Sequence, residues 1–226
     1  MVPAFVIGKI NQDNADQLLQ KTKAVNDGSL HVFLSDQRPH YQEAILKSFG
    51  RWLQPERRGA RGPFPKPRLE PTPDLLYAQV VKHRHKGRVV SITQKIVFGT
   101  QAMLDAYLDR SPVSQHLNTA FVERHNGTMR HQNRRFTRKT LSFSKEDYWM
   151  ERQLHLSLSY YHFCWAHAGL RQKIAPPIPT KGSGSPKKWQ QVTPAMATGV
   201  TDHPWTLEEL LTFRVPPPIN STVKGH

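Results

Sequence analysis

The residues best suited to chemistry lie between Asn118 and Lys145, where one carboxylate precedes a dense run of basic side chains. A helix that begins near Thr119 gathers four polar side chains on one face, at offsets of zero, three, seven and eleven: Glu123, Asn126, Arg130 and Arg134. A carboxylate within a basic face can hold a metal ion against a phosphate backbone, while arginines bind the flanking phosphates. An amphipathic surface helix with an isolated glutamate explains the same local pattern.

A second carboxylate, Asp36, follows the apolar segment Leu30–Ser35, which is typical of a buried strand. Ligands of α/β folds bind beyond the carboxyl ends of strands, so Asp36 is expected at such an edge. It lies 87 positions before Glu123. Carboxylate oxygens suit Mg²⁺ or Mn²⁺, which serve phosphoryl transfer on DNA, although a two-metal site usually draws on a third carboxylate.

The charge of the chain favours nucleic acid as the partner. Lys and Arg number 32 against 17 Asp and Glu, for a formal net charge of +15. A membrane surface is the second choice, but no apolar run approaches the roughly 18 residues that span a bilayer, and residues 1–10 lack the features of a signal peptide. The single cysteine, Cys164, excludes an intrachain disulfide and a cysteine-based zinc finger, and suits a reducing cytoplasm.

An α/β framework is expected to position these side chains. The patterns predict strands at 4–7, 30–35, 75–82 and 88–98, and helices at 11–25, 39–49 and 100–108. Residues 55–73 are rich in Pro, Arg and Gly, which predicts an exposed loop or a mobile arm that either contacts DNA or is a surface insertion. Residues 82–87 are read as a solvated basic turn, since His83 and His85 have no third metal ligand nearby.

The C-terminal third is expected to be mainly helical. A capping-box-like sequence at Ser144–Asp147 opens a helix whose apolar stripe is predicted to be core: Trp149, Leu156, Tyr160 and Phe163. Residues 175–186 are rich in Pro, Gly and Ser and predict a linker. Thr206 and Glu209 predict a second capping box, and the prolines at 216–218 end that helix.

Four segments of the chain, in order, carry a resemblance: 34–49 around Asp36, 118–145 around Glu123, 160–171, and 193–211. Together they resemble bacterial insertion-sequence transposases of the DDE class. The resemblance implies an RNase H-like fold, similar to an integrase catalytic core, with a helical C-terminal extension. In that family three carboxylates bind two Mg²⁺ or Mn²⁺ ions that drive DNA strand cleavage and transfer.

Asp36 matches the second acid of this triad and Glu123 the third, so the resemblance implies that both are catalytic residues and metal ligands. The implied DNA contacts are Arg124, Asn126, Arg130, Arg134, Arg135, Arg138 and Lys139. The family's first Asp, on its first strand, has no match, so this chain is expected to begin after that strand and to be inactive alone. A missing strand would expose a sheet edge, which favours self-association. The expected division is a catalytic domain at 1–170, a linker at 171–192 and a tail with a short helix at 193–226.

Two functions are compatible with these motifs. The first is a transposase-derived enzyme domain that acts on transposon ends and target DNA. The second is a non-catalytic DNA-binding remnant that binds transposon ends or associates with full-length transposase. A basic structural protein unrelated to transposition is disfavoured by the ordered motifs. Either function implies a bacterial cytoplasmic protein at the nucleoid, a possible homo-oligomer, with no membrane partner.

Overall fold

The computed structural model describes residues 4–26, 32–57, 64–111, 114, 116–117, 119–137 and 139–214. The chain divides into two compact units, residues 2–147 and residues 148–226. Both contain helices and strands, so the predicted mixed α/β class is confirmed.

The first unit is built on a three-stranded sheet with the order β1–β4–β5. The strands are β1 (Val32–Asp36), β4 (Leu76–His85) and β5 (Arg88–Phe98). β1 is parallel to β4, and β4 is antiparallel to β5. The β4–β5 hairpin turns at Lys86 and Gly87, whose φ angles are 46° and 80°, as a type I′ turn requires. The predicted basic turn is therefore shorter than expected, because His83 and His85 belong to β4.

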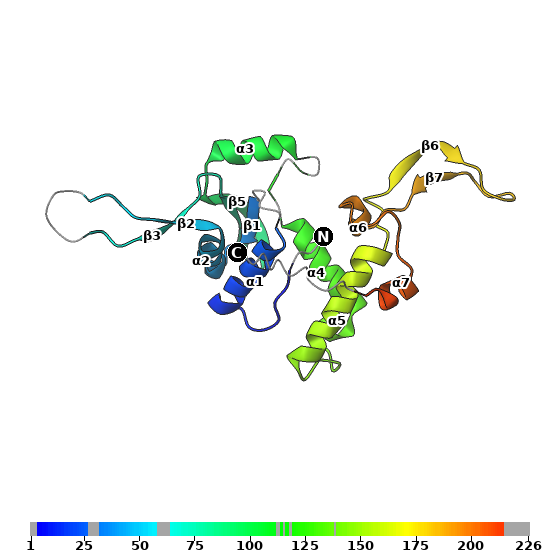
Figure 1. Ribbon diagram of the computed structural model, residues 1–226, viewed down its shortest axis with the longest axis horizontal. Helices are drawn as coiled ribbons and strands as arrows, with labels where there is room; N and C mark the ends of the chain where they lie inside the picture. Colours follow the sequence, from blue (N-terminus) through cyan, green and yellow to red (C-terminus); the bar gives the residue numbers. More distant parts are fainter. Residues whose placement is uncertain are drawn as a thin grey trace, which may run out of the picture. The chain divides into compact units, whose positions relative to one another are not determined.

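Helices cover both faces of this sheet (Figure 1). α1 (Gln12–Ala24) and α2 (Pro39–Phe49) pack on one face through Leu19 and Ile45, against Tyr77 of β4. α3 (Gln101–Arg110) packs on the other through the fully buried Leu104, which joins a cluster with Leu76, Ala78, Val80 and Leu117. Burial on both faces explains why the first five residues of β4 are all buried.

Local signals set the ends of these helices. The Asn11 side chain accepts the Asn14 backbone N–H and begins α1, Pro39 stands at the first position of α2, and the Thr100 side chain caps α3. The three predicted helices are therefore confirmed. The strand predicted at 4–7 is wrong, because these residues have no strand partner in the structure.

The segment predicted as a loop or arm at 55–73 connects the two strands of an antiparallel ribbon and contains the second of them. β2 (Gly50–Leu53) pairs with β3 (Arg68–Pro71). Residues 58–63 lie outside the described part of the chain. Pro71 is tolerated at the end of β3 because a strand in a two-stranded ribbon leaves one backbone edge unpaired.

The helix expected from Thr119 is α4 (Ala120–Gln132), with Thr119 at its N-cap position. It is followed by the 3₁₀ turn η1 (Arg134–Phe136). The expectation that Arg134 continues the Glu123 face of one helix is therefore wrong. α4 ends because the Asn133 side chain accepts the Arg135 backbone N–H and begins the tighter turn.

The second unit begins with α5 (Asp147–Ser159), which passes into a π-helical turn, η2 (Tyr160–Cys164). The predicted core stripe is wrong for most of its members, since Trp149, Leu156 and Tyr160 are exposed. Leu158 and His162 are buried instead. Phe163 does pack, with its ring centroid 4.5 Å from that of Trp205.

The remaining elements of this unit are β6 (Gln172–Ile178), β7 (Lys187–Gln190), α6 (Pro194–Ala197) and α7 (Leu207–Thr212). β6 and β7 form an antiparallel hairpin, so the segment expected to be a linker contains paired strands. Figure 1 shows this hairpin extending away from α6. In the part of the chain that the structure describes, no helix is both long and apolar enough to cross a membrane.

Candidate functional site

Asp36 is the last residue of β1 and stands opposite Val80 of β4 in the parallel register. Alternate residues of a strand share a face, so Asp36 lies on the same face as Val32, which packs in the α3 cluster with Val80. Its side chain is more than half exposed and pairs with the Arg38 guanidinium, with 3.0 Å between Nε and Oδ2. The predicted position of Asp36 at a strand's carboxyl edge is confirmed.

Glu123 lies in the first turn of α4. Its carboxylate forms an ion pair with the Lys82 ammonium and accepts a hydrogen bond from Thr119 Oγ1 at 2.9 Å. Lys82 and Thr119 together hold the pKa of Glu123 below its ordinary value, and the Lys82 hydrogen bond is the larger cause. The single acid of this helix is thus a neutralised group and not an isolated negative charge.

The β-sheet register brings the two acids to the same end of one sheet face. Lys82 follows Val80 by two positions on β4, so its side chain leaves on the face that carries Asp36. Glu123 is tied to Lys82, which places α4 over that end of the sheet. Sequence separation alone could not show this, because Lys82 and Glu123 are 41 positions apart.

The donor set at this edge does not fit Mg²⁺ or Mn²⁺ as it stands. Each carboxylate is engaged by a basic side chain, Asp36 by Arg38 and Glu123 by Lys82. Among the described residues, no three His, Cys, Asp or Glu side chains are grouped so as to hold a metal ion. A hard cation needs several oxygen ligands, so both ion pairs would have to open and a third ligand would have to join.

The exposed surface of α4 is basic. Arg124, Asn126 and Arg130 are all exposed, as is Arg134 on the following turn. Within the described part of the chain, Arg124, Arg130 and Arg134 form no ion pair. Unpaired guanidinium groups at a surface are available to bind phosphate, which they contact in a bidentate manner.

The segment after α4 is folded back by polar contacts. Thr137 Oγ1 donates to the Arg130 carbonyl at 3.1 Å, and Arg135 Nη1 donates to Ser144 Oγ at 2.6 Å. Lys139 adopts a left-handed backbone conformation with φ of 56° and is exposed. Arg138 lies outside the described residues.

Charge along this stretch has one sign. From Arg124 to Lys145 the chain carries seven Lys and Arg residues and no Asp or Glu. Arg130, one of these seven, lies in the last turn of α4, where a cation complements the helix dipole. We call the surface formed by the described residues of 124–145 the α4 surface. Its chemistry is that of an anion-binding surface.

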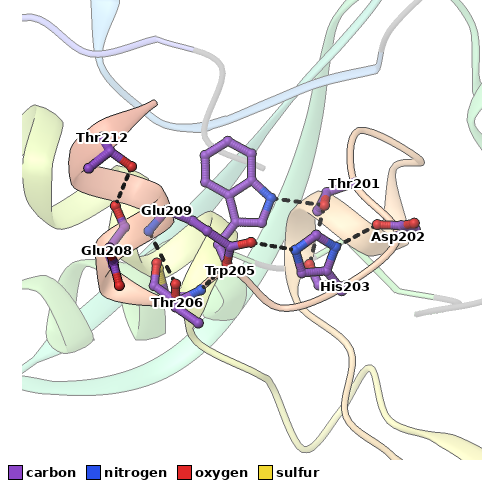
Figure 2. A network of polar contacts seen from close by, with 9 residues as sticks. Thr201, Asp202, His203, Trp205, Thr206, Glu208, Glu209 and Thr212 are labelled. Carbon is purple, nitrogen blue, oxygen red and sulfur yellow. Dashed lines mark hydrogen bonds and ion pairs between the residues drawn. The ribbon is translucent and has the colours of Figure 1, made fainter. Parts of the chain in front are cut away.

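A polar cluster in the second unit joins His203, which the sequence predictions did not include, to the capping box predicted at Thr206 and Glu209. His203 Nδ1 lies 2.6 Å from Asp202 Oδ1, and His203 Nε2 lies 3.1 Å from Glu209 Oε1 (Figure 2). Glu209 also completes the predicted capping box of α7, because it accepts the Thr206 N–H at 2.6 Å while Thr206 Oγ1 accepts the Glu209 N–H. Trp205 Nε1 donates to Thr201 Oγ1 at 2.9 Å in the same cluster.

We call this cluster the His203 clasp, because its contacts tie the loop before α7 to Glu209 of that helix. The two carboxylates raise the pKa of His203, with the Asp202 hydrogen bond as the larger cause. Both ring nitrogens are occupied, so the imidazole has no free nitrogen with which to accept a proton from a substrate. The sequence signal was present in the spacing of Asp202, His203 and Glu209, but nothing in that spacing showed that the loop folds back.

Comparison with family models, curated proteins and solved structures finds no match to this chain. The residues and their geometry are therefore the basis for a functional conclusion. Of the residues singled out in the sequence, Asp36 and Glu123 are brought to one sheet edge, and Arg124, Asn126 and Arg130 share one exposed helix.

Proposed function

We propose that this chain binds DNA through the α4 surface, in the manner of a DDE-class transposase. The observation that supports the proposal most strongly is the acid-free run of basic side chains from Arg124 to Lys145 on and after α4, whose described Lys and Arg members are exposed. Neutralising phosphates with Lys and Arg releases condensed counterions, which supplies most of the affinity for DNA. Glu123 does not oppose this attraction, because Lys82 compensates its charge.

The RNase H-like arrangement is part of the same proposal. It is supported by the parallel pair β1–β4, by helices on both faces of the sheet, and by the position of Asp36 at the carboxyl end of β1. Among the described strands β1 pairs with β4 alone, so its other edge can accept a further strand. That edge is where the family's first strand would lie.

The proposal is tested by the salt dependence of binding to a labelled duplex of about 30 base pairs. The double variant Arg130→Ala/Arg134→Ala removes two exposed guanidinium groups from the α4 surface. We expect the slope of log K against log salt to fall in magnitude by about 1.8, or ~0.9 for each phosphate that is no longer neutralised.

The matched control is Lys9→Ala/Lys21→Ala, which removes the same charge from the region of α1. α1 packs on the sheet face opposite α3, so this variant should keep the wild-type slope. Equal slopes for all three proteins would remove the α4 surface from the DNA interface.

Metal-dependent DNA strand cleavage is the second candidate function. It is favoured by one observation, the convergence of Asp36 and Glu123 at the same end of a sheet face. Because the donor set there does not fit a metal ion as it stands, we derive no catalytic step. The test is nicking of supercoiled DNA with Mg²⁺ or Mn²⁺, compared with Glu123→Gln. Activity that survives this substitution would show that Glu123 is not a metal ligand.

A further inference from the structure

The β6–β7 hairpin is an exposed ribbon without a core of its own. Its register pairs Gln172 with Gln190 and Lys173 with Trp189. Every residue from 171 to 191 is exposed except Ile174, which is partly buried. A two-stranded hairpin without a buried side chain is marginally stable in water, so its fold gains from a partner.

Like the α4 surface, the ribbon carries basic residues and no acidic ones. It carries five basic residues and no acidic one between positions 171 and 191: Arg171, Lys173, Lys181, Lys187 and Lys188. The acid-free stretch is longer still, since no Asp or Glu occurs from residue 152 to residue 201. Such a surface attracts a polyanion and repels another copy of itself.

One face of the ribbon combines the cations with an aromatic ring. Lys173 stands directly opposite Trp189, and Lys187 precedes Trp189 by two positions, so these three side chains share a face. The Arg171 guanidinium lies over the Trp189 indole, with 4.2 Å between Cζ and the ring centroid. Lys188, between Lys187 and Trp189, points to the opposite face. We call the face that carries Lys173, Lys187 and Trp189 the Trp189 face.

We propose that the β6–β7 hairpin is a second DNA-binding element, which enters a groove of duplex DNA with its Trp189 face toward the nucleic acid. This inference rests on the proposed DNA-binding function and adds a contact from the other unit of the chain. The major groove, about 12 Å wide, admits a two-stranded ribbon whose strands lie about 4.8 Å apart. Lys173 and Lys187 bind phosphates, and the stacked pair of Arg171 and Trp189 adds a flat, charged edge at the Lys173 end of this face.

Anionic membrane is a poorer fit to the same ribbon. A membrane-surface element needs one continuous apolar face. Here the Trp189 face is interrupted by Lys173 and Lys187, and the opposite face carries Lys188 together with two glutamines, Gln172 and Gln190. Neither face is apolar throughout, so the ribbon matches a polyanion in water.

The test compares two neighbouring lysines in the full chain. Lys187→Gln and Lys188→Gln remove the same charge from adjacent positions of β7 but from opposite faces. Binding to a duplex is measured from about 50 to about 200 mM salt. We expect Lys187→Gln to lower the magnitude of the salt slope by about 0.9, which shrinks the loss of affinity across this range about threefold. Lys188→Gln should change the slope by less than half as much.

Trp189→Ala provides an independent readout, because it removes the ring without removing a charge. It should weaken binding several-fold at every salt concentration and leave the slope nearly unchanged. Trp189 is 41% exposed, so circular dichroism should show an intact fold in this variant.

Failure of the inference is distinguishable from failure of the proposed function. If the hairpin variants bind like wild type while Arg130→Ala/Arg134→Ala binds weakly, the α4 surface alone binds DNA and the inference is overturned. Equal effects of Lys187→Gln and Lys188→Gln would overturn the assignment to one face. If the wild-type protein does not bind the duplex but binds phosphatidylserine vesicles, and Lys187→Gln and Trp189→Ala weaken that vesicle binding, the partner is a membrane. Both proposals then fail.

Discussion

The α4 surface and the β6–β7 hairpin are both basic, but different contacts hold them in place. α4 is anchored by the buried Met129 and by the ion pair that joins Glu123 to Lys82 of the central sheet. The hairpin has no buried side chain and is organised by strand pairing and by the contact between Arg171 and Trp189. The same kind of surface is therefore built once on a helix with a buried side chain and a link to the sheet, and once on an exposed ribbon.

This difference between the two regions predicts which residues affect stability and which affect ligand binding. Residues under the α4 surface are expected to affect stability and binding together, because Met129 is buried and Lys82 ties the helix to the sheet. Residues of the hairpin are expected to affect binding alone. Variants of both regions test this separation.

The largest effect is expected from the core of the first unit. Leu104→Ala opens a cavity between α3 and the sheet, since Leu104 is fully buried. We expect a loss of about 2–5 kcal/mol in the free energy of unfolding, measured by urea denaturation of this unit. Trp189→Ala, the contrasting change in the hairpin, should stay within about 0.5 kcal/mol of wild type. Similar losses of unfolding free energy in both variants would show that Trp189 stabilises the fold as a core residue does.

The next effect concerns the joint contribution of the two surfaces to binding. Arg130→Ala/Arg134→Ala combined with Lys173→Gln/Lys187→Gln removes four cations in total. If both surfaces contact one duplex, the salt slope should fall in magnitude by about 3.6, the sum of the two double variants. A combined effect no larger than that of either double variant would mean that the surfaces do not bind the same DNA together.

A smaller effect, of opposite sign, is expected at Glu123. Glu123→Gln leaves the Lys82 ammonium without its partner, so the region beside the α4 surface gains one net positive charge and affinity for the duplex should rise about threefold, or ~0.6 kcal/mol. Lys82→Gln leaves the Glu123 carboxylate without its partner, so affinity should fall by a similar factor. The exposed Lys82–Glu123 pair contributes only about 0–1 kcal/mol to stability, so melting should change little. Weaker binding by Glu123→Gln would mean that this carboxylate serves DNA binding directly.

The smallest effect is a pH dependence of the clasp around His203. Its pKa is raised by Asp202 and Glu209, so the contribution of the protonated imidazole is complete below about pH 6.5 and is lost as the pH rises through the raised value. The pKa of Asp202 is lowered chiefly by His203, and that of Glu209 chiefly by the Thr206 N–H. Their contributions are lost as the pH falls below about 4.5.

Hydrogen exchange of the Glu209 amide, which donates to Thr206 Oγ1, measures this local stability. After correction for intrinsic rates, protection should be greatest between about pH 4.5 and pH 6.5. His203→Gln should flatten the upper limb of this profile. An upper limb that is unchanged in the variant would assign the pH dependence to another group.

Much of the first unit follows from local sequence signals. Asn11, Pro39 and Thr100 predicted the starts of three helices, and each is a helix start in the structure. Such signals act over one turn and do not depend on distant residues. The end of α4 was missed because the helical periodicity continues to Arg134, whereas the side chain of Asn133 competes for the backbone.

Features that depend on pairing between distant residues were harder to predict from the sequence. The strands of the β6–β7 hairpin were read as a linker because Pro176 and Pro177 weaken a strand signal, although prolines are tolerated in an edge ribbon. The position of Asp36 could be predicted, since it depends on one strand. The neutralisation of Glu123 by Lys82 could not, because it depends on where α4 lies on the sheet.

DNA binding through the α4 surface is tested most directly by measuring the affinity of the wild-type chain for duplex DNA as a function of salt. The exposed cations of the α4 surface that the structure describes without a partner in an ion pair include Arg124, Arg130, Arg134 and Lys139. We expect a slope of log K against log salt of about −3.6 or steeper, or ~0.9 for each of these four cations. Binding with a slope near zero, or no binding at about 50 mM salt, would contradict it.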